Sequence, residues 1–258
     1  MDDVIIHTLE QPHLNKPILV EGLPGIGLVG KLAGDHLKDQ IKAIKFAEIT
    51  SPYKPTQVII KDDGTLRLVN MEFYYHAFND PAKNDIILLL GDFQGITPDS
   101  QYQLTEKTLD YVQTLGVHKI FTLGGLGTGH ITTSPTVFGA ATNAHLKKEV
   151  EEAGVVFRGG GIIFGASGLL LGLGMRRNIE AICLMGETHG QIIDAKSAEA
   201  VLEVLARLIK VPVDMTELKK KAKETESQIA KISQMMAANQ MEGRQQDYPD
   251  DSTVSYIR

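Results

Sequence analysis

The amino-acid sequence predicts an α/β fold, a layered α/β/α sandwich built around a largely parallel sheet. Short, continuously apolar segments such as DIILLL at residues 85–90 are typical of strands that are buried on both faces of a parallel sheet. As far as residue 210, such segments alternate with longer ones in which apolar residues recur at helical spacing. Strands that alternate with helices indicate layers of helices packed on one sheet.

Composition restricts the class of protein and the class of partner. Of the 258 residues, 43% are hydrophobic and 22% are charged, which suffices for one large domain with a sizeable core. The net charge of −6 argues against a nucleic acid as partner. The acidic N-terminus is unlike a signal peptide, and no apolar segment is long enough to cross a membrane. Because the single cysteine, Cys183, cannot form an internal disulfide, we expect a cytoplasmic protein without a membrane partner.

The first part of the chain is predicted to contain a strand, a helix, a second strand and a hairpin. The first strand is the apolar run at residues 17–20, and the helix covers residues 28–40. The second strand covers residues 43–49. The hairpin turns at Asp62-Asp63-Gly64, where glycine supplies the positive φ that such a turn requires. Its two strands are residues 57–61 and 65–70.

Three more strands and two helices are expected before residue 213. The run at residues 85–90 forms a strand, a helix covers residues 100–115, and residues 119–123 form the next strand. Residues 181–185 (AICLM) form another strand that is buried on both faces. The helix that follows is amphipathic and is expected to cover the sheet. Its apolar positions are Ala198, Val201, Leu202, Leu205, Leu208 and Ile209.

The character of the sequence changes after residue 213. We therefore divide the chain into an α/β domain at residues 1–213, a C-terminal helix at residues 214–239 and a flexible tail at residues 240–258. The tail has few apolar residues and many turn-forming residues, and for this reason it is predicted to be disordered.

The C-terminal helix carries a narrow seam of apolar residues. From Met215 to Met236 these residues recur in alternating steps of three and four, which is a heptad-like pattern. Such a seam fits a helix packed on its own domain and fits equally a contact between subunits. For the contact between subunits we expect Leu218, Ile229 and Ile232 to be the oligomerisation residues.

A glycine-rich turn follows the first strand in the stretch VEGLPGIGLVGKL at residues 20–32. Residues 25–30 match the dinucleotide fingerprint G-x-G-x-x-G, and residues 25–31 match most of a phosphate loop. However, Leu32 stands where a phosphate loop has the serine or threonine that binds Mg²⁺. The dinucleotide fingerprint is weak alone, since three glycines between a strand and a helix also permit close packing. We therefore interpret the stretch as a structural turn, and we expect no cofactor.

A second glycine-rich loop, at residues 124–130, follows a strand, where open α/β sheets bind their ligands. Gly125, Gly127 and His130 form a possible small-molecule loop, and the alternative is a flexible loop without a ligand. A third, at residues 159–174, alternates glycine with large apolar residues, which suits close backbone approach in a core or interface. The histidines are scattered and show no metal-ligand spacing, so no metal site and no catalytic residues are expected.

Four stretches occur in order along the chain. They are EGLPGIGLVGK at residues 21–31, Gly91-Asp92-Phe93-Gln94, Phe121-Thr122-Leu123-Gly124-Gly125, and residues 184–198 with the helical segment that follows. Together they resemble the proteasome assembly chaperone family, in particular its archaeal members, over about residues 16–235. The resemblance implies a sandwich related to the nucleoside-phosphorylase architecture, without established catalysis. It also implies a self-associating chaperone that binds 20S proteasome α-subunits or their assembly intermediates.

The resemblance also gives the tail a role. Proteasome activators and some assembly chaperones end in a hydrophobic residue, tyrosine and any residue, and this motif inserts between α-subunits. Here the last three residues are Tyr256, Ile257 and Arg258, so the tyrosine is third from last and Ser255 replaces the hydrophobic residue. We expect these three residues to bind the partner, although one extra residue moves the terminal carboxylate by about 3.5 Å.

Our leading hypothesis is a non-enzymatic, homo-oligomeric chaperone for assembly of the 20S proteasome. The alternative from another class is an enzyme on a phosphorylase-like fold that acts on a small nucleoside or phosphate-bearing ligand. Such an enzyme would use the loop at residues 124–130 together with Glu187 or His189. A scaffold for some unrelated partner would have the same sequence features and would differ only in that it does not bind the proteasome.

Overall fold

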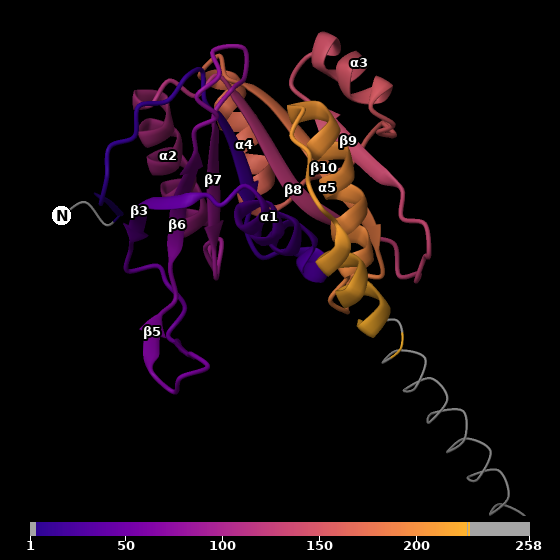
Figure 1. The fold of residues 1–258 in the computed structure, drawn as a ribbon, viewed down its shortest axis with the longest axis horizontal. Coiled ribbons are helices and arrows are strands. Elements are labelled where there is room, and N and C mark those ends of the chain that lie inside the picture. The colour runs from indigo at the N-terminus through magenta and orange to yellow at the C-terminus, as the bar shows by residue number, and fades with distance from the viewer. Residues whose placement is uncertain (1–3, 226, 228–258) are drawn as a thin grey trace, which may run out of the picture.

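A computed structural model describes residues 4–225 and residue 227, and its centre is an eight-stranded sheet with helices on both faces (Figure 1). The strands follow one another across the sheet in the order β1-β3-β6-β7-β2-β8-β10-β9. The layered α/β/α fold expected from the sequence is confirmed.

The four central strands are parallel to one another. They are β7 (Ile86–Gly91), β2 (Ile18–Gly22), β8 (Lys119–Gly127) and β10 (Glu180–Thr188). Every residue of β7 is buried, as its uninterrupted apolar run predicts. The expected strands at residues 119–123 and 181–185 are both confirmed, and each extends further than its apolar run indicates.

The outer strands pair in antiparallel fashion. On one side of the sheet β6 (Met71–His76) pairs with β7, β3 (Ile44–Thr50) pairs with β6, and β1 (Ile5–Thr8) pairs with β3. On the other side β9 (Val137–Ala141) pairs with β10. Because β3 is antiparallel to β6, and β6 to β7, β3 runs in the direction of the central strands. Five of the eight strands therefore share one direction, which confirms a largely parallel sheet.

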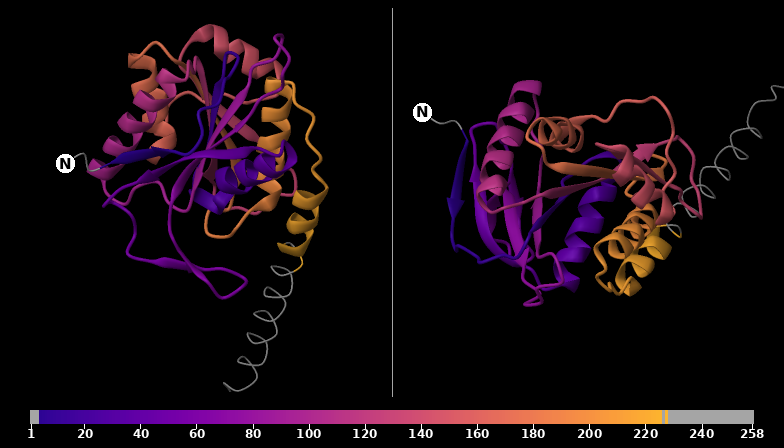
Figure 2. Two further views of the ribbon diagram at one scale, coloured as in Figure 1. Left: turned by 60° about the vertical axis from the view of Figure 1, so that its left-hand side comes forward. Right: turned by 90° about the horizontal axis from the view of Figure 1, so that it is seen from above.

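Helices cover both faces of this sheet, as Figure 2 shows. On one face α1 (Val29–Gln40) packs against α5 (Ala195–Ile209), with α3 (Ala144–Glu152) beside β9. On the other face α2 (Pro98–Thr114) packs against α4 (Gly165–Arg176). Each face has its own apolar core, and each aliphatic side chain buried there contributes roughly 1.5–3 kcal/mol to stability.

The expected hairpin is confirmed as β4 (Val58–Ile60) and β5 (Leu66–Leu68), two antiparallel strands that extend away from the main sheet (Figure 1). Gly64 in its turn has φ of +80°, the left-handed conformation expected there. The hairpin exposes four aliphatic side chains, those of Val58, Ile60, Leu66 and Leu68.

The C-terminal segment packs on its own chain as far as the structure describes it. Residues 216–225 are helical, and Leu218 is 1% exposed within the core that also contains α1 and α5. At its start, Nε2 of His36 on α1 lies 2.6 Å from the carbonyl oxygen of Asp214. Of the two alternatives for Leu218, the structure shows packing on its own domain. This corrects the expectation that Leu218 contacts another subunit, because the residue is already enclosed.

The remaining predictions for this end of the chain fall outside the described residues. They concern Ile229, Ile232 and the tail at residues 240–258, and the domain boundaries at residues 213 and 239 stay predictions. Among the described residues, no helix is both long enough and apolar enough to cross a membrane.

Candidate functional site

The glycine-rich turn between β2 and α1 is shaped by close packing. It contains the 3-10 turn η1 (Ile26–Leu28), in which Gly27 has φ of +62°. A Cβ atom on Gly30 would lie 2.1 Å from the carbonyl oxygen of Leu123, so only glycine lets α1 approach β8 this closely. Nζ of Lys31 donates to the carbonyl oxygen of Gly91 at 3.1 Å and forms an ion pair with Asp35. These contacts support the interpretation of the stretch as a structural turn.

A crevice opens beside this turn, at the carboxyl ends of β2, β8 and β10. Its volume is about 400 Å³, and the N-terminal end of α4 forms its opposite wall. This is the edge at which open α/β sheets bind ligands. Of the three residues of the possible small-molecule loop, Gly125 and Gly127 line the crevice. His130 is exposed further along the loop and does not line it.

The polar centre of the crevice is Glu21, near the end of β2, whose side chain is 1% exposed. Its Oε1 accepts a hydrogen bond from the backbone N–H of Leu23 at 2.9 Å, and its Oε2 accepts one from Oγ of Ser167 on α4 at 2.9 Å. Burial raises the pKa of Glu21 to about 7, although both hydrogen bonds act to lower it. At neutral pH the carboxyl group is therefore near the midpoint of its titration.

Glu21 belongs to a row of side chains across three adjacent strands. Thr122 on β8 is in register with Glu21 on β2 and with Cys183 on β10. Burial raises the pKa of the Cys183 thiol to about 12, so this thiol is protonated and unreactive at neutral pH.

Gln94 joins the two walls of the crevice. Its Nε2 donates to the carbonyl oxygen of Pro24 in the glycine-rich turn at 2.7 Å, and its Oε1 accepts from the backbone N–H of Ala166 at 2.9 Å. The side chain thus holds the turn after β2 against the first turn of α4. The φ of +74° favours glycine at position 165, and a Cβ atom there would lie 2.1 Å from Oε1 of Gln94 and would displace the amide that joins the two walls.

The rest of the crevice is mainly apolar and carries little charge. Leu23, Ile26 and Met185 line it, and Ile162 and Phe164 lie at its mouth with 76% and 78% of their surfaces exposed. Among the described residues, no lysine, arginine or histidine lines the crevice. Glu187 and His189, the acid and base considered for an enzyme, do not line it either, and Oε2 of Glu187 accepts from the backbone N–H of Thr136.

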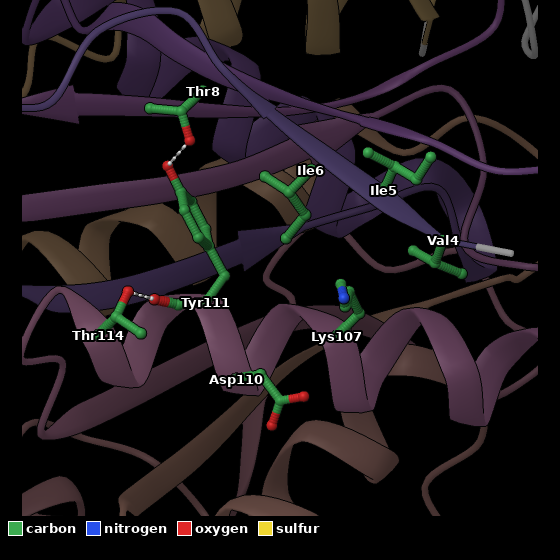
Figure 3. Close-up of a pocket in the computed structure, with 8 residues that line it drawn as sticks. All are labelled: Val4, Ile5, Ile6, Thr8, Lys107, Asp110, Tyr111 and Thr114. Atoms are coloured by element: carbon green, nitrogen blue, oxygen red, sulfur yellow. Dashed lines mark hydrogen bonds between the residues drawn. The ribbon is translucent and has the colours of Figure 1, made fainter. Parts of the chain in front are cut away.

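A second hollow lies between the edge strand β1 and helix α2 (Figure 3). Tyr111 extends from α2 toward β1, where its hydroxyl lies 3.1 Å from Oγ1 of Thr8. Asp110 points away from β1 and pairs with Arg177. This hollow lies at the edge of the sheet, whereas the crevice at Glu21 lies at the carboxyl ends of parallel strands, where open α/β sheets bind ligands, so the crevice is the better candidate for a ligand.

Sequence reasoning missed Glu21 and Ser167. The available signal was one charged residue inside the otherwise apolar strand ILVEG, since an acidic side chain in a buried strand needs a specific partner. Nothing in the sequence links it to Ser167, which is 146 positions away. Among the described residues, no group of three or more potential metal-binding side chains is found. Tyr256, Ile257 and Arg258 lie outside the described residues.

Known proteins resemble this chain over most of its length. A model of the PAC2 family matches residues 19–233. The uncharacterized protein MJ1210 of Methanocaldococcus jannaschii is 39% identical over 246 residues, which cover 95% of this chain and 93% of that protein.

Two crystal structures from Pyrococcus furiosus have the same fold. PbaB, an archaeal proteasome activator, has a TM-score of 0.86 and 40% identity, covering 90% of this chain and 100% of that chain. PbaA, an archaeal homologue of proteasome-assembly chaperone, has a TM-score of 0.73 and 27% identity, covering 92% and 99% of the two chains.

Proposed function

This chain belongs to the PAC2 family, and from that membership we propose that it is a non-enzymatic chaperone that assists assembly of the 20S proteasome. The observation that carries the proposal is the similarity to PbaA and PbaB, which extends over at least 90% of this chain. Both of those proteins are named for a role with the proteasome, so family membership supports a chaperone role.

We further propose that the partners are α-subunits of the 20S proteasome or their assembly intermediates. Contact would be made in part by Tyr256, Ile257 and Arg258, with self-association through Ile229 and Ile232. One short tail binds weakly, because ordering it costs free energy that few contacts offset. Several tails on one oligomer raise the effective concentration, so the assembly can bind usefully.

A second candidate is an activator of the assembled proteasome. It is favoured by the higher similarity to PbaB, at 40% identity, than to PbaA, at 27%. An activator acts on the complete particle, whereas an assembly chaperone acts on free α-subunits. The two functions therefore differ in which form of the proteasome the chain binds and affects.

The enzyme alternative receives little support from the crevice. A phosphate-bearing ligand needs positive charge or free backbone N–H groups, and among the described residues no basic side chain lines the crevice. In the first turn of α4 the backbone N–H of Ala166 already donates to Gln94, and the hydroxyl of Ser167 already donates to Glu21. Titration of the full chain with purine nucleosides, phosphate and ATP is expected to release no heat.

The decisive experiment is co-purification with purified proteasome components. The full chain is mixed separately with free α-subunits and with assembled 20S particles, and each mixture is captured through the chain. A chaperone retains the α-subunits and increases the yield of assembled particles. An activator retains the assembled particle and increases its peptidase rate. Retention of neither form contradicts both functions.

A further inference from the structure

The crevice at the carboxyl ends of β2, β8 and β10 contains an ionisable group that the chaperone function does not use. Glu21 is buried, and it is the one charged side chain among the described residues that line the crevice. A carboxyl group is rarely buried without a basic partner, because removal of its charge from water is costly. Here a Ser hydroxyl and one backbone N–H are its two hydrogen-bond donors.

The surroundings of Glu21 supply no positive charge from the described residues that line the crevice. From β10 the titratable neighbour is the Cys183 thiol, whose raised pKa of about 12 keeps it neutral. From α4 and the glycine-rich turn, the neighbours are the Ser167 hydroxyl and the Leu23 N–H, and Gln94 adds a neutral amide to the wall. The crevice thus supplies a negative charge when Glu21 ionises and no side chain of opposite charge.

The size and lining of the crevice fit a small organic molecule. Its volume of about 400 Å³ lies within the range of about 300–1,000 Å³ that is typical of small-molecule sites. Most of the lining is aliphatic or aromatic, and Ile162 and Phe164 expose apolar surface at the mouth. A ligand with an apolar body would cover this surface, and its polar group would reach Glu21.

We propose that the crevice binds a small organic ammonium ion, a molecule with a mainly apolar body and one protonated amine that contacts the Glu21 carboxylate. An amine supplies both the positive charge and the N–H donors that the crevice lacks. When Glu21 is ionised, its negative charge repels an anionic ligand. The inference stands on the crevice alone and does not depend on proteasome binding.

Binding of this kind is linked to the protonation of Glu21. The ammonium ion requires the ionised carboxylate, and burial holds the pKa of Glu21 at about 7 in the empty crevice. Well below pH 7 the affinity should fall about tenfold for each pH unit, because a proton must first be released. Above pH 7 the affinity should level off until the amine itself loses its proton, near pH ~10.

The test compares three probes of one shape by saturation-transfer NMR and calorimetry on the full chain. They are 2-phenylethylamine, neutral 2-phenylethanol and anionic 3-phenylpropionate. We expect the amine to bind most tightly at pH 8 and to weaken about tenfold per unit below pH 7, while the alcohol binds weakly at every pH. Binding of no probe, equal binding of amine and alcohol, or preference for the anion would overturn the proposal.

Two variants test whether the amine binds at Glu21. Glu21→Gln keeps the shape of the side chain and should weaken amine binding at pH 8 at least tenfold and remove its pH dependence. Glu152→Gln, at an exposed position on α3 that does not line the crevice, removes the same charge and should bind the amine like the unmodified chain. Unchanged amine binding by Glu21→Gln would refute the assignment. If this variant does not fold, the pH profile of the unmodified chain still decides.

Discussion

The hydroxyl of Ser167, in the first turn of α4, donates a 2.9 Å hydrogen bond to the carboxylate of Glu21 on β2. This contact joins the helix to the central strand at the point where the sheet opens into the crevice. It also places a buried acid beside the amino end of a helix, where a negative charge is stabilised. Even so, burial dominates, and the pKa of Glu21 is raised rather than lowered.

The raised pKa predicts how stability depends on pH. In the unfolded chain the pKa of Glu21 is near its ordinary value of 4.5, and in the folded chain it is about 7. Between these values the folded state holds more protons, so the contribution of Glu21 is fully present below pH 4.5 and is lost as pH rises through 7. The loss amounts to about 3 kcal/mol.

Glu21→Gln should remove this dependence. We expect the variant to be more stable than the unmodified chain at pH 8, with the difference shrinking or reversing at pH 5. Urea unfolding of both proteins at several pH values measures it, and Glu152→Gln is the control for a lost surface charge. If the stability difference between the two proteins does not change with pH, Glu21 is not buried as described.

Substitution of two glycines, Gly27 and Gly64, distinguishes the cost of backbone strain from the cost of a steric clash. Gly27 and Gly64 both have positive φ, of +62° and +80°. A Cβ atom on Gly27 would lie 2.8 Å from Oγ1 of Thr188, whereas one on Gly64 would have no atom within 4 Å. Gly64→Ala should therefore cost about 1–2 kcal/mol, and Gly27→Ala about 1–3 kcal/mol more. Chemical denaturation checks both values, and equal losses would show that the turn at Gly27 is not tightly packed.

Lys31→Ala tests whether the glycine-rich turn binds nucleotide. The lysine makes one hydrogen bond and one partly exposed ion pair, so its loss should cost no more than about 1–2 kcal/mol. Folding and partner binding should change little. The contrary result would be ATP or NAD binding at micromolar affinity that Lys31→Ala abolishes.

The sequence predicts the centre of this fold better than its edges and its site. A continuous apolar run predicts β7, and Asp62-Asp63-Gly64 predicts the hairpin. Both can be predicted because each signal lies within a few neighbouring residues. The helix α4 has no such signal. Its segment GASGLLLGLGMR is rich in glycine, which disfavours helices, and the packing of α4 against α2, β8 and β10 outweighs that propensity. Glu21 and Ser167 are likewise joined by topology alone.

Self-association is predicted to depend on Ile229 and Ile232. The double change Ile229→Asp and Ile232→Asp places two charges in the apolar seam, which costs several kcal/mol if the seam is buried. Light scattering should then show a smaller species. Lys220→Asp and Lys223→Asp, at exposed positions of the helical residues 216–225, add two aspartates outside the seam and should leave the mass unchanged. A double isoleucine variant of unchanged mass would place self-association elsewhere.

The tail prediction concerns Tyr256, Ile257 and Arg258. Tyrosine offers a rigid ring and a hydroxyl at low entropy cost, and the terminal carboxylate adds a charge. Deletion of residues 256–258 should weaken binding to the proteasome while fold and subunit number stay the same. If the chain self-associates as proposed, an oligomer presents several tails, and the loss should then be larger for the oligomer than for the smaller species formed by the isoleucine variant.

Deletion of Arg258 alone tests the register of the motif. It makes Tyr256 the penultimate residue and moves the terminal carboxylate by about 3.5 Å toward the ring. If the tail docks between α-subunits as the family motif does, this shorter chain should bind more tightly than the full one. Surface plasmon resonance of the full chain and both deletions, over immobilised 20S particles and α-rings, measures the order of affinities. Equal binding by all three forms would mean that the tail is idle, and the contact would then have to come from the folded domain.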